Sequence, residues 1–179
     1  IFSRCKKEVF MNLTIQKAAP EDAADLLDYL RKAGAETGNL TFGEEGIPFT
    51  VEQEAAYIAS VRNSSNSVML VARLDGKLVG NASFNSTPRE RLKHRGELGI
   101  SVLKEAWGMG IGTKLMEAVI DFAKTTANAD IIHLEVRSDN TRAIRLYERF
   151  GFEKIGTFRG FLKINGELID FDLMNLYFP

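Results

Sequence analysis

The chain has 179 residues, 45% of them apolar, which is enough for one domain to bury a substantial core. Its 23 basic and 24 acidic residues nearly cancel, so no overall field favours nucleic acid or an anionic membrane surface as a partner. The longest apolar runs fall far short of the roughly 20 residues that a membrane helix needs, so we expect no membrane span.

The first ten residues lack the continuous apolar stretch of a secretory signal, although they carry three basic side chains. We interpret residues 1–10 as a leader, either added to the natural protein or read from upstream of it, with Met11 as the natural start. Residues 11–179 then form a single domain. The only cysteine, Cys5, excludes an internal disulfide and favours a reducing, cytoplasmic location. Because Cys5 has no organised neighbours, we do not expect it to be a nucleophile.

The first third of the chain predicts a strand, a helix, a loop and a second helix. Residues 12–18 alternate apolar and polar side chains, and Pro20 opens a helix whose leucines share one face. Residues 34–48 are rich in glycine and lack periodicity, so we interpret them as a loop beside a binding cleft. Thr50 and Gln53 form a capping box that starts the second helix.

Two strands follow, over residues 67–74 and 77–84, and the turn pair Asp75-Gly76 predicts that they form an antiparallel hairpin. The basic cluster 89–95 has no interleaved aromatic residues, so a solvated loop is favoured over a nucleic-acid site. The rest of the chain predicts a strand at 96–103, a helix at 111–123, a strand at 131–136, a short helix between Asn140 and Gly151, and a hairpin of 152–164 with 167–178 around Asn165-Gly166. This order indicates a mixed α/β domain without internal repeats.

Three glycines at alternate positions, Gly108, Gly110 and Gly112, stand where a strand gives way to a helix. Their backbone N–H groups and the helix dipole are suited to an anion such as a phosphate. A dinucleotide fingerprint would need a glycine where Thr113 stands, and a P-loop would need a lysine at the helix start. On this pattern alone, a turn that merely permits tight packing is about as strongly favoured as a phosphate site.

From about Asn12 to its C-terminus the sequence resembles the GCN5-related N-acetyltransferases. Their pyrophosphate loop reads Gln or Arg, any, any, Gly, any, Gly or Ala, and Gly110 and Gly112 fill its glycine positions. Trp107 stands where the family usually has the polar residue, which leaves the backbone donors in place. The resemblance implies that this loop binds the pyrophosphate of acetyl-coenzyme A through the segment Trp107, Gly108, Met109, Gly110, Ile111, Gly112 and Thr113.

Two further segments carry the resemblance. Residues 97–102 look like the strand along which the pantetheine arm lies, so Ile100, Ser101 and Val102 are expected to bind the cofactor. The pattern from Leu134 through Asn140 and Tyr147 to Phe152 looks most like the ribosomal-protein N-terminal acetyltransferases. The resemblance implies a central, mostly antiparallel mixed sheet flanked by helices, with the donor between two diverging parallel strands.

Acetyl transfer from a thioester requires a neutral amine, a stabilised oxyanion and a proton for the leaving thiolate. Alkylamines have a pKa of about 10 and α-amino groups one near 8, so a base or a water path is required. Glu135 resembles the base of the ribosomal enzymes and Glu97 is its rival, while either could instead be a surface charge paired with an arginine. Tyr147 matches the general acid, with a core aromatic as the alternative. Asn140 is expected both to cap a helix and to bind the pantetheine.

The two histidines, His94 and His133, have no metal-ligand partner at useful spacing, so we assign no metal. Ser101 lacks a histidine and an acid beside it, which argues against a hydrolytic triad. The acceptor could be a protein N-terminus, a polyamine or an antibiotic. A homodimer is also possible. The rival from another class is an acyl-CoA-binding sensor without catalysis. Glu44, Glu45, Asp170 and Asp172 could attract a cationic amine or could equally be ordinary solvated carboxylates.

Overall fold

The computed structural model describes residues 12–179, so the interpretations of the leader and of Cys5 lie outside the described residues. The first half contains β1 (Leu13–Lys17), α1 (Ala23–Glu36), α2 (Val51–Arg62), β2 (Ser67–Leu74), β3 (Lys77–Ser86) and β4 (Arg95–Val102). The second half contains α3 (Ile111–Thr125), β5 (Ile131–Arg137), α4 (Thr141–Arg149), β6 (Glu153–Ile164) and β7 (Glu167–Tyr177). Short 3-10 turns, Pro20–Asp22 and Lys104–Ala106, precede α1 and follow β4.

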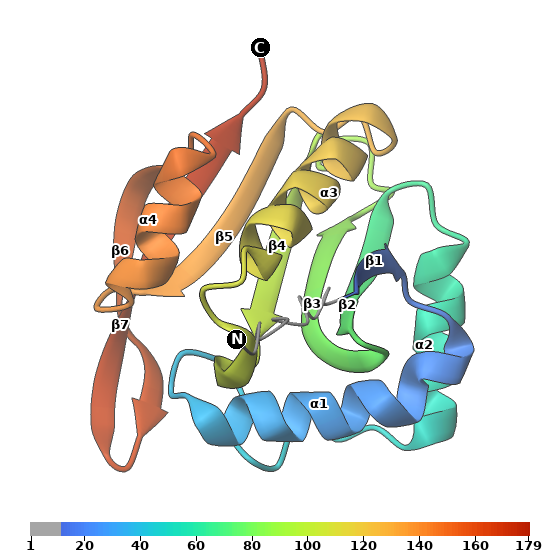
Figure 1. Ribbon diagram of the computed structural model, residues 1–179. Helices are drawn as coiled ribbons and strands as arrows, with labels where there is room; N and C mark the ends of the chain where they lie inside the picture. Colours follow the sequence, from blue (N-terminus) through green and yellow to red (C-terminus); the bar gives the residue numbers. More distant parts are fainter. Residues whose placement is uncertain (1–11) are drawn as a thin grey trace, which may run out of the picture.

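The strands form one sheet in the order β1-β2-β3-β4-β5-β7-β6. All neighbouring strands are antiparallel except β4 and β5, which run parallel. The predicted fold class, a mostly antiparallel mixed sheet with flanking helices, is confirmed, as is the order of the elements (Figure 1).

Both predicted hairpin turns are present. Asp75 and Gly76 between β2 and β3 have φ of 49° and 84°, and Asn165 and Gly166 between β6 and β7 have φ of 50° and 87°. Two consecutive residues with positive φ give the backbone twist that joins antiparallel strands through a two-residue loop. These turns fix the register of both hairpins.

Helices cover both faces of the sheet. One core contains the inner faces of α3 and α4 against alternate residues of β2 to β5, including Leu70, Ala72 and Leu98. A second core joins α1 and α2 to the opposite face through Val71 and Leu78. In Figure 1, α3 and α4 lie over the sheet in view, and α1 runs along its lower edge. Successive side chains of a strand alternate between faces, which is why neighbours such as Leu70 and Val71 belong to different cores.

The parallel pairing between β4 and β5 is short. It covers only Arg95–Glu97 of β4 and Ile131–His133 of β5, although both strands continue beyond these residues. The unpaired ends flank a cavity that also contacts α4. The expected gap between two diverging parallel strands is therefore present.

One predicted boundary is wrong. The loop predicted at 34–48 begins only after Glu36, because Gly34 to Glu36 form the last turn of α1. A Cβ at Gly34 would clash with the backbone carbonyl of Gly43, so the glycine permits the loop to cross closely over the helix rather than ending it. Leu40, Phe42 and Ile47 from this loop pack against the second core.

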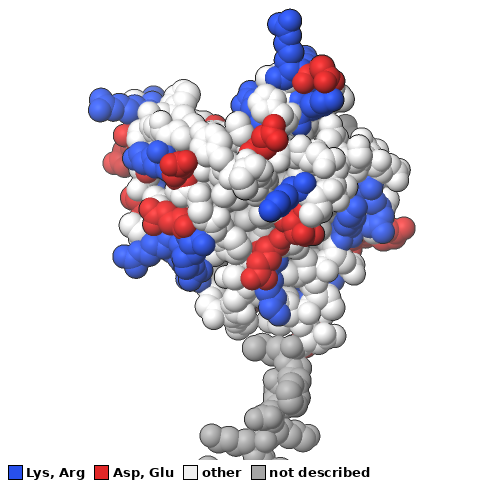
Figure 2. Space-filling view, turned by 90° about the horizontal axis from the view of Figure 1, so that it is seen from above, with Lys and Arg blue, Asp and Glu red and all other residues white. Residues whose placement is uncertain are grey.

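Charged residues of both signs are interspersed on the face shown in Figure 2. Among residues 12–179, none of the helices has the length and apolar character needed to cross a membrane.

Candidate active site

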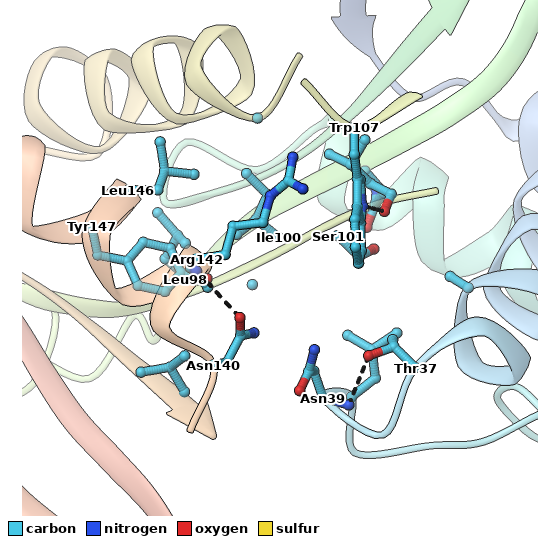
Figure 3. A pocket seen from close by; sticks show the side chains of 18 of the residues that line it. Thr37, Asn39, Leu98, Ile100, Ser101, Trp107, Asn140, Arg142, Leu146 and Tyr147 are labelled. Atoms are coloured by element: carbon cyan, nitrogen blue, oxygen red, sulfur yellow. Dashed lines mark hydrogen bonds between the residues drawn. The ribbon is translucent and has the colours of Figure 1, made fainter. Parts of the chain in front are cut away.

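A cavity of about 850 Å³ lies between β4 and β5. Its other walls are the segment from Trp107 to the start of α3, the inner side of α4 and the loop after α1. Figure 3 shows Tyr147 and Arg142 projecting from α4 on one side, Trp107 on the other, and Thr37 and Asn39 from the loop. Segments that are distant in sequence thus form a single site.

The glycine segment forms one end of this cavity. Gly108 and Gly110 have φ of 80° and 77°, and a Cβ at either would meet no protein atom within 4 Å. Gly110 is the N-cap of α3, and no side chain caps this helix. The unfilled N–H groups at the start of the helix are therefore available to an anion. Gly112 and Thr113, in the first turn of α3, also line the cavity.

One member of the predicted loop lies outside the cavity. Met109 is 42% exposed and does not line the cavity, whereas Ile111 lines it although its side chain is buried in the core beneath α3. Trp107 donates from Nε1 to the carbonyl oxygen of Val102 at 2.7 Å. This hydrogen bond anchors the loop to the end of β4 through an aromatic residue.

The end of β4 turns backbone donors toward the gap. The Leu103 N–H donates to the Val79 carbonyl at 2.9 Å, and the antiparallel register with β3 is continuous. In an antiparallel ladder the backbone N–H and C=O groups of every second residue form hydrogen bonds with the same neighbouring strand. The backbone groups of the odd-numbered residues of β4 therefore point to β3, and those of the even-numbered residues point toward β5. Because the pairing with β5 ends at Glu97, the N–H groups of Ile100 and Val102 face the cavity.

Ser101 belongs to the odd-numbered set, so its backbone faces β3. Its hydroxyl lies 2.8 Å from the hydroxyl of Tyr29 on α1. Tyr29 is buried, and this burial raises its pKa well above the ordinary value. A protonated Tyr29 therefore ties α1 to β4 behind the cavity, a contact that no sequence signal indicated.

Asn140 caps α4 as predicted, because its Oδ1 accepts a hydrogen bond from the N–H of Ala143 at 3.2 Å. Both helices that start at the cavity, α3 and α4, lack an acidic residue in the first turn. By contrast, α1 has Asp25 there and α2 has Glu52 and Glu54. Since acidic residues normally complement the positive end of a helix, their absence at these two helix starts favours an anionic ligand.

Tyr147 lies on α4, 7% exposed, with its ring 5.9 Å from that of Phe152. Its hydroxyl makes no hydrogen bond to any residue that the structure describes, and the side chain lines the cavity. Burial raises the pKa of Tyr147 far above its ordinary value. The phenol therefore stays protonated at neutral pH and is available as a proton donor.

Glu97 and Glu135 line the cavity from neighbouring strands, on the face of the sheet that carries α1. The pKa of Glu135 is raised by partial burial and then by the negative charge of Glu97, while His133 opposes this shift. The nearest oxygen of Glu135 lies 3.9 Å from Nε2 of His133, whose Nδ1 lies 2.8 Å from Oδ1 of Asn175. A carboxylate with a raised pKa is better matched to accepting a proton near neutral pH.

Three basic residues of α4 belong to the site but were not predicted from the sequence. Arg142, Arg145 and Arg149 line the cavity together with the predicted residues. Their spacing of three and four residues places them on one helix face, which the sequence alone could have revealed. Thr37 and Asn39 in the loop after α1 were also missed, since a loop offers no periodic signal.

Three of the four acidic residues considered for amine attraction interact with other groups. Asp172 is bound by Lys154 at 2.8 Å and by the hydroxyls of Ser138 and Thr157. Asp170 accepts a hydrogen bond from the backbone of Gly160, and the carboxylate of Glu45 one from the backbone of Gly43. Neither aspartate lines the cavity. Within residues 12–179, no group of three or more potential ligand side chains is arranged to hold a metal ion.

The sequence matches the model of the acetyltransferase (GNAT) family over residues 26–152. A crystal structure of an acetyltransferase of the GNAT family from Streptococcus pneumoniae superposes with a TM-score of 0.90 and 31% identity, covering 93% of this chain and 100% of that one. The match extends over nearly all of both chains, so it concerns the whole fold.

Two curated relatives match over shorter lengths. The L-amino acid N-acetyltransferase AaaT of Escherichia coli is 35% identical over 101 residues, which cover 56% of this chain and 62% of that protein. The N-alpha-acetyltransferase RimI of Mycobacterium tuberculosis is 34% identical over 95 residues, covering 53% and 58%. The predicted family resemblance is confirmed, and the relatives include enzymes with different acceptors.

Proposed function

The chain belongs to the acetyltransferase (GNAT) family, and on that premise we propose that the cavity between β4 and β5 transfers an acetyl group from acetyl-CoA directly to a primary amine. The observation that carries this proposal is the short parallel ladder. Because pairing stops after Glu97, two backbone donors of β4 face a cavity that also has two helix starts and a buried phenol on its walls.

The donor supplies an acetyl thioester, which an unprotonated amine attacks at the carbonyl carbon. The segment from Gly108 to Thr113 would hold the pyrophosphate through N–H groups at the start of α3. The cavity suits this group, since Gly108 and Gly110 leave open space there and no carboxylate stands in either adjacent first turn. Asn140 would bind a pantetheine amide while capping α4.

The reacting carbonyl needs a donor for its developing negative charge. The N–H groups of Ile100 and Val102 are the candidates because they face the gap without a partner strand. Backbone donors fixed by the β3 ladder need no reorganisation during the reaction, which is the condition for effective oxyanion stabilisation. The hydroxyl of Ser101 is engaged with Tyr29, so direct transfer is favoured over a serine-bound intermediate.

Proton movement would use residues on both sides of the cavity. As the bond between carbon and sulfur breaks, Tyr147 donates its phenolic proton to the departing thiolate. Glu135, directly or through water, takes the proton that the attacking amine loses. Its raised pKa supports this role, and the nearby charge of Glu97 contributes to that pKa. The two carboxylates also favour a cationic amine over an anionic acceptor.

The acceptor class is a primary amine that enters beside the loop after α1, where Thr37 and Asn39 border the cavity. We test it by measuring thiol release from acetyl-CoA with L-amino acids, peptides with free N-termini, polyamines and aminoglycosides. Amine-dependent release with at least one class is expected. Tight acetyl-CoA binding with no release for any amine would contradict the proposal and favour an acyl-CoA sensor.

A further inference from the structure

Trp107 lies directly before the glycine segment and is anchored by a hydrogen bond. The family pattern has a polar residue at this position, whereas here the indole Nε1 bonds the carbonyl oxygen of Val102 at 2.7 Å. Trp107 is 38% exposed although its ring is anchored at one edge. An aromatic face is thus fixed in position beside Gly108.

Arg142 packs on this face from the other side of the cavity. Its Cζ lies 4.5 Å from the centre of the Trp107 ring, a distance typical of a cation–π contact. Arg142 forms no ion pair or side-chain hydrogen bond with any residue in the described range 12–179. The planar guanidinium keeps its N–H groups available while it stacks, which an ammonium group could not do equally well.

The position of Arg142 is electrostatically unfavourable in the protein alone. It is the second residue of α4, directly after the cap residue Asn140 and Thr141, where the helix dipole disfavours a cation. The start of α3 adds a second positive helix end to the same cavity. An anion between the two helix starts would reverse this penalty.

We propose that Arg142, positioned by Trp107, binds the pyrophosphate of the cofactor and replaces the polar side chain that Trp107 displaces from the loop. This inference rests on the proposed function for the nature of the anion. It assigns the pyrophosphate rather than the 3′-phosphate, because the ring that holds Arg142 directly precedes Gly108 and Gly110, where the open backbone donors lie. Arg142 is a binding residue and Trp107 a positioning residue.

A series of ligands separates the phosphates. Arg142→Ala should weaken CoA and dephospho-CoA about equally, by about tenfold or more, since one charge-assisted contact is lost. The kcat/KM for S-acetylpantetheine, which has no pyrophosphate, should stay within about twofold of the unmodified protein. Arg91→Ala, which removes an exposed arginine outside the cavity, is the charge-matched control and should change none of these values.

The role of Trp107 is tested by a double-mutant cycle. Trp107→Ala should reproduce the ligand pattern of Arg142→Ala, and the double variant should be no weaker than either single one by more than about threefold. Trp107→Phe, which keeps an aromatic face, should retain most of the affinity for CoA. It replaces Trp107→Ala in the test if that variant has a much lower melting temperature than the unmodified protein. Additive losses would overturn the coupling.

Two other outcomes would overturn the assignment. If Arg142→Ala weakened the affinity for CoA but not for dephospho-CoA, Arg142 would bind the 3′-phosphate. If it lowered kcat/KM for S-acetylpantetheine by the same factor, its role would be purely structural. The affinities for CoA and dephospho-CoA are measured by calorimetry without an amine. A failure of acetyl transfer in the unmodified protein would therefore show separately, as the failure of the proposed function.

Discussion

Tyr147 combines two properties that distinguish a proton donor from a packing residue. Its ring is buried against Phe152, while its hydroxyl lines the cavity and has no hydrogen-bond partner among the described residues. A hydroxyl without a protein partner can donate its hydrogen bond to a bound ligand or to water. The sequence could identify Tyr147 through its interval from Asn140, whereas its isolation from protein partners follows only from the packing of α4.

Tyr147→Phe should reduce kcat by about a hundredfold or more, because the leaving thiolate loses its proton donor. The affinity for CoA should change by less than about threefold, and the melting temperature should not fall, since no protein hydrogen bond is removed. Steady-state kinetics, calorimetry and thermal melting measure the three quantities. A rate that is unchanged across the pH range would remove Tyr147 as the acid.

Glu97→Gln should move the acidic limb of the kcat/KM profile to lower pH. The charge of Glu97 disfavours ionisation of Glu135 and so raises the pKa of Glu135. Without that charge, Glu135 loses its proton at lower pH and can act as a base from that lower pH upward. The profiles of both proteins are compared with the same amine, so the titration of the amine is common to them. Glu135→Gln should abolish this limb and lower kcat by about a hundredfold.

A loss of all activity in Glu97→Gln, with full activity in Glu135→Gln, would exchange the two roles. The sequence left this choice open, because both glutamates occur in strands with neighbouring arginines. The structure shows that the surroundings of Glu135 raise its pKa. Burial acts on Glu135 together with a like charge, and the nearest cationic candidate, His133, is 3.9 Å away.

The helices that border the cavity begin in different ways. Asn140 gives α4 a side-chain cap, whereas α3 starts at Gly110 without one. A sequence pattern of alternate glycines predicted this segment correctly as a helix start. The pattern could not show that the side chain of Ile111 is buried in the core or that Met109 lies outside the cavity, because both depend on how the loop packs against the rest of the fold.

Gly110→Glu should abolish binding of CoA, since a carboxylate would occupy the space meant for the pyrophosphate. Gly76→Glu is the matched control: Gly76 also has positive φ and open space, but it lies in the hairpin between β2 and β3. Both variants should lose about 1–2 kcal/mol of stability from the left-handed backbone conformation. Calorimetry with CoA should show a loss only for Gly110→Glu, and retained affinity would refute the pyrophosphate assignment.

Glu54 on α2 is a separate case of an unfavourable buried group. It is 1% exposed, its Oε2 has no partner within the described part of the chain, and burial raises its pKa. Because the pKa of the folded state lies above that of the unfolded state, stability falls as the pH rises above the unfolded value. Glu54 precedes Ile58 by four residues and Val61 by seven, so helical spacing places it on the buried face of α2, unlike its exposed neighbour Glu52.

Glu54→Gln should therefore stabilise the protein by about 1 kcal/mol at pH 7, with a smaller gain at pH 4 where the carboxyl group is protonated. Thermal or denaturant unfolding at both pH values measures the difference. Glu52→Gln, on the same helix but exposed, should give no gain. An equal effect of Glu54→Gln at the two pH values would show that ionisation of the side chain is not the cause.

At the scale of the whole molecule, all seven strands belong to one sheet, but the pairing between β4 and β5 stops after Glu97 and leaves room for the cavity. The order of the elements along the chain and both hairpins could be predicted, because side-chain alternation and the pairs Asp75-Gly76 and Asn165-Gly166 act locally. Without the family resemblance, the end of the pairing at Glu97 could not be predicted, since it depends on the angle between two strands joined by the whole of α3. The acceptor side could not be predicted either, because Gly34 continues α1 and shifts the loop.

The most direct test of the account is a single-turnover reaction of acetyl-CoA, the protein and an amine found active in the thiol-release assay, followed by mass spectrometry of protein and amine. Direct transfer predicts that the amine gains one acetyl group, with an equal amount of CoA released, while the mass of the protein stays unchanged throughout. An acetylated protein that forms and decays before the acetylated amine appears, or CoA release without any acetylated amine, would contradict it.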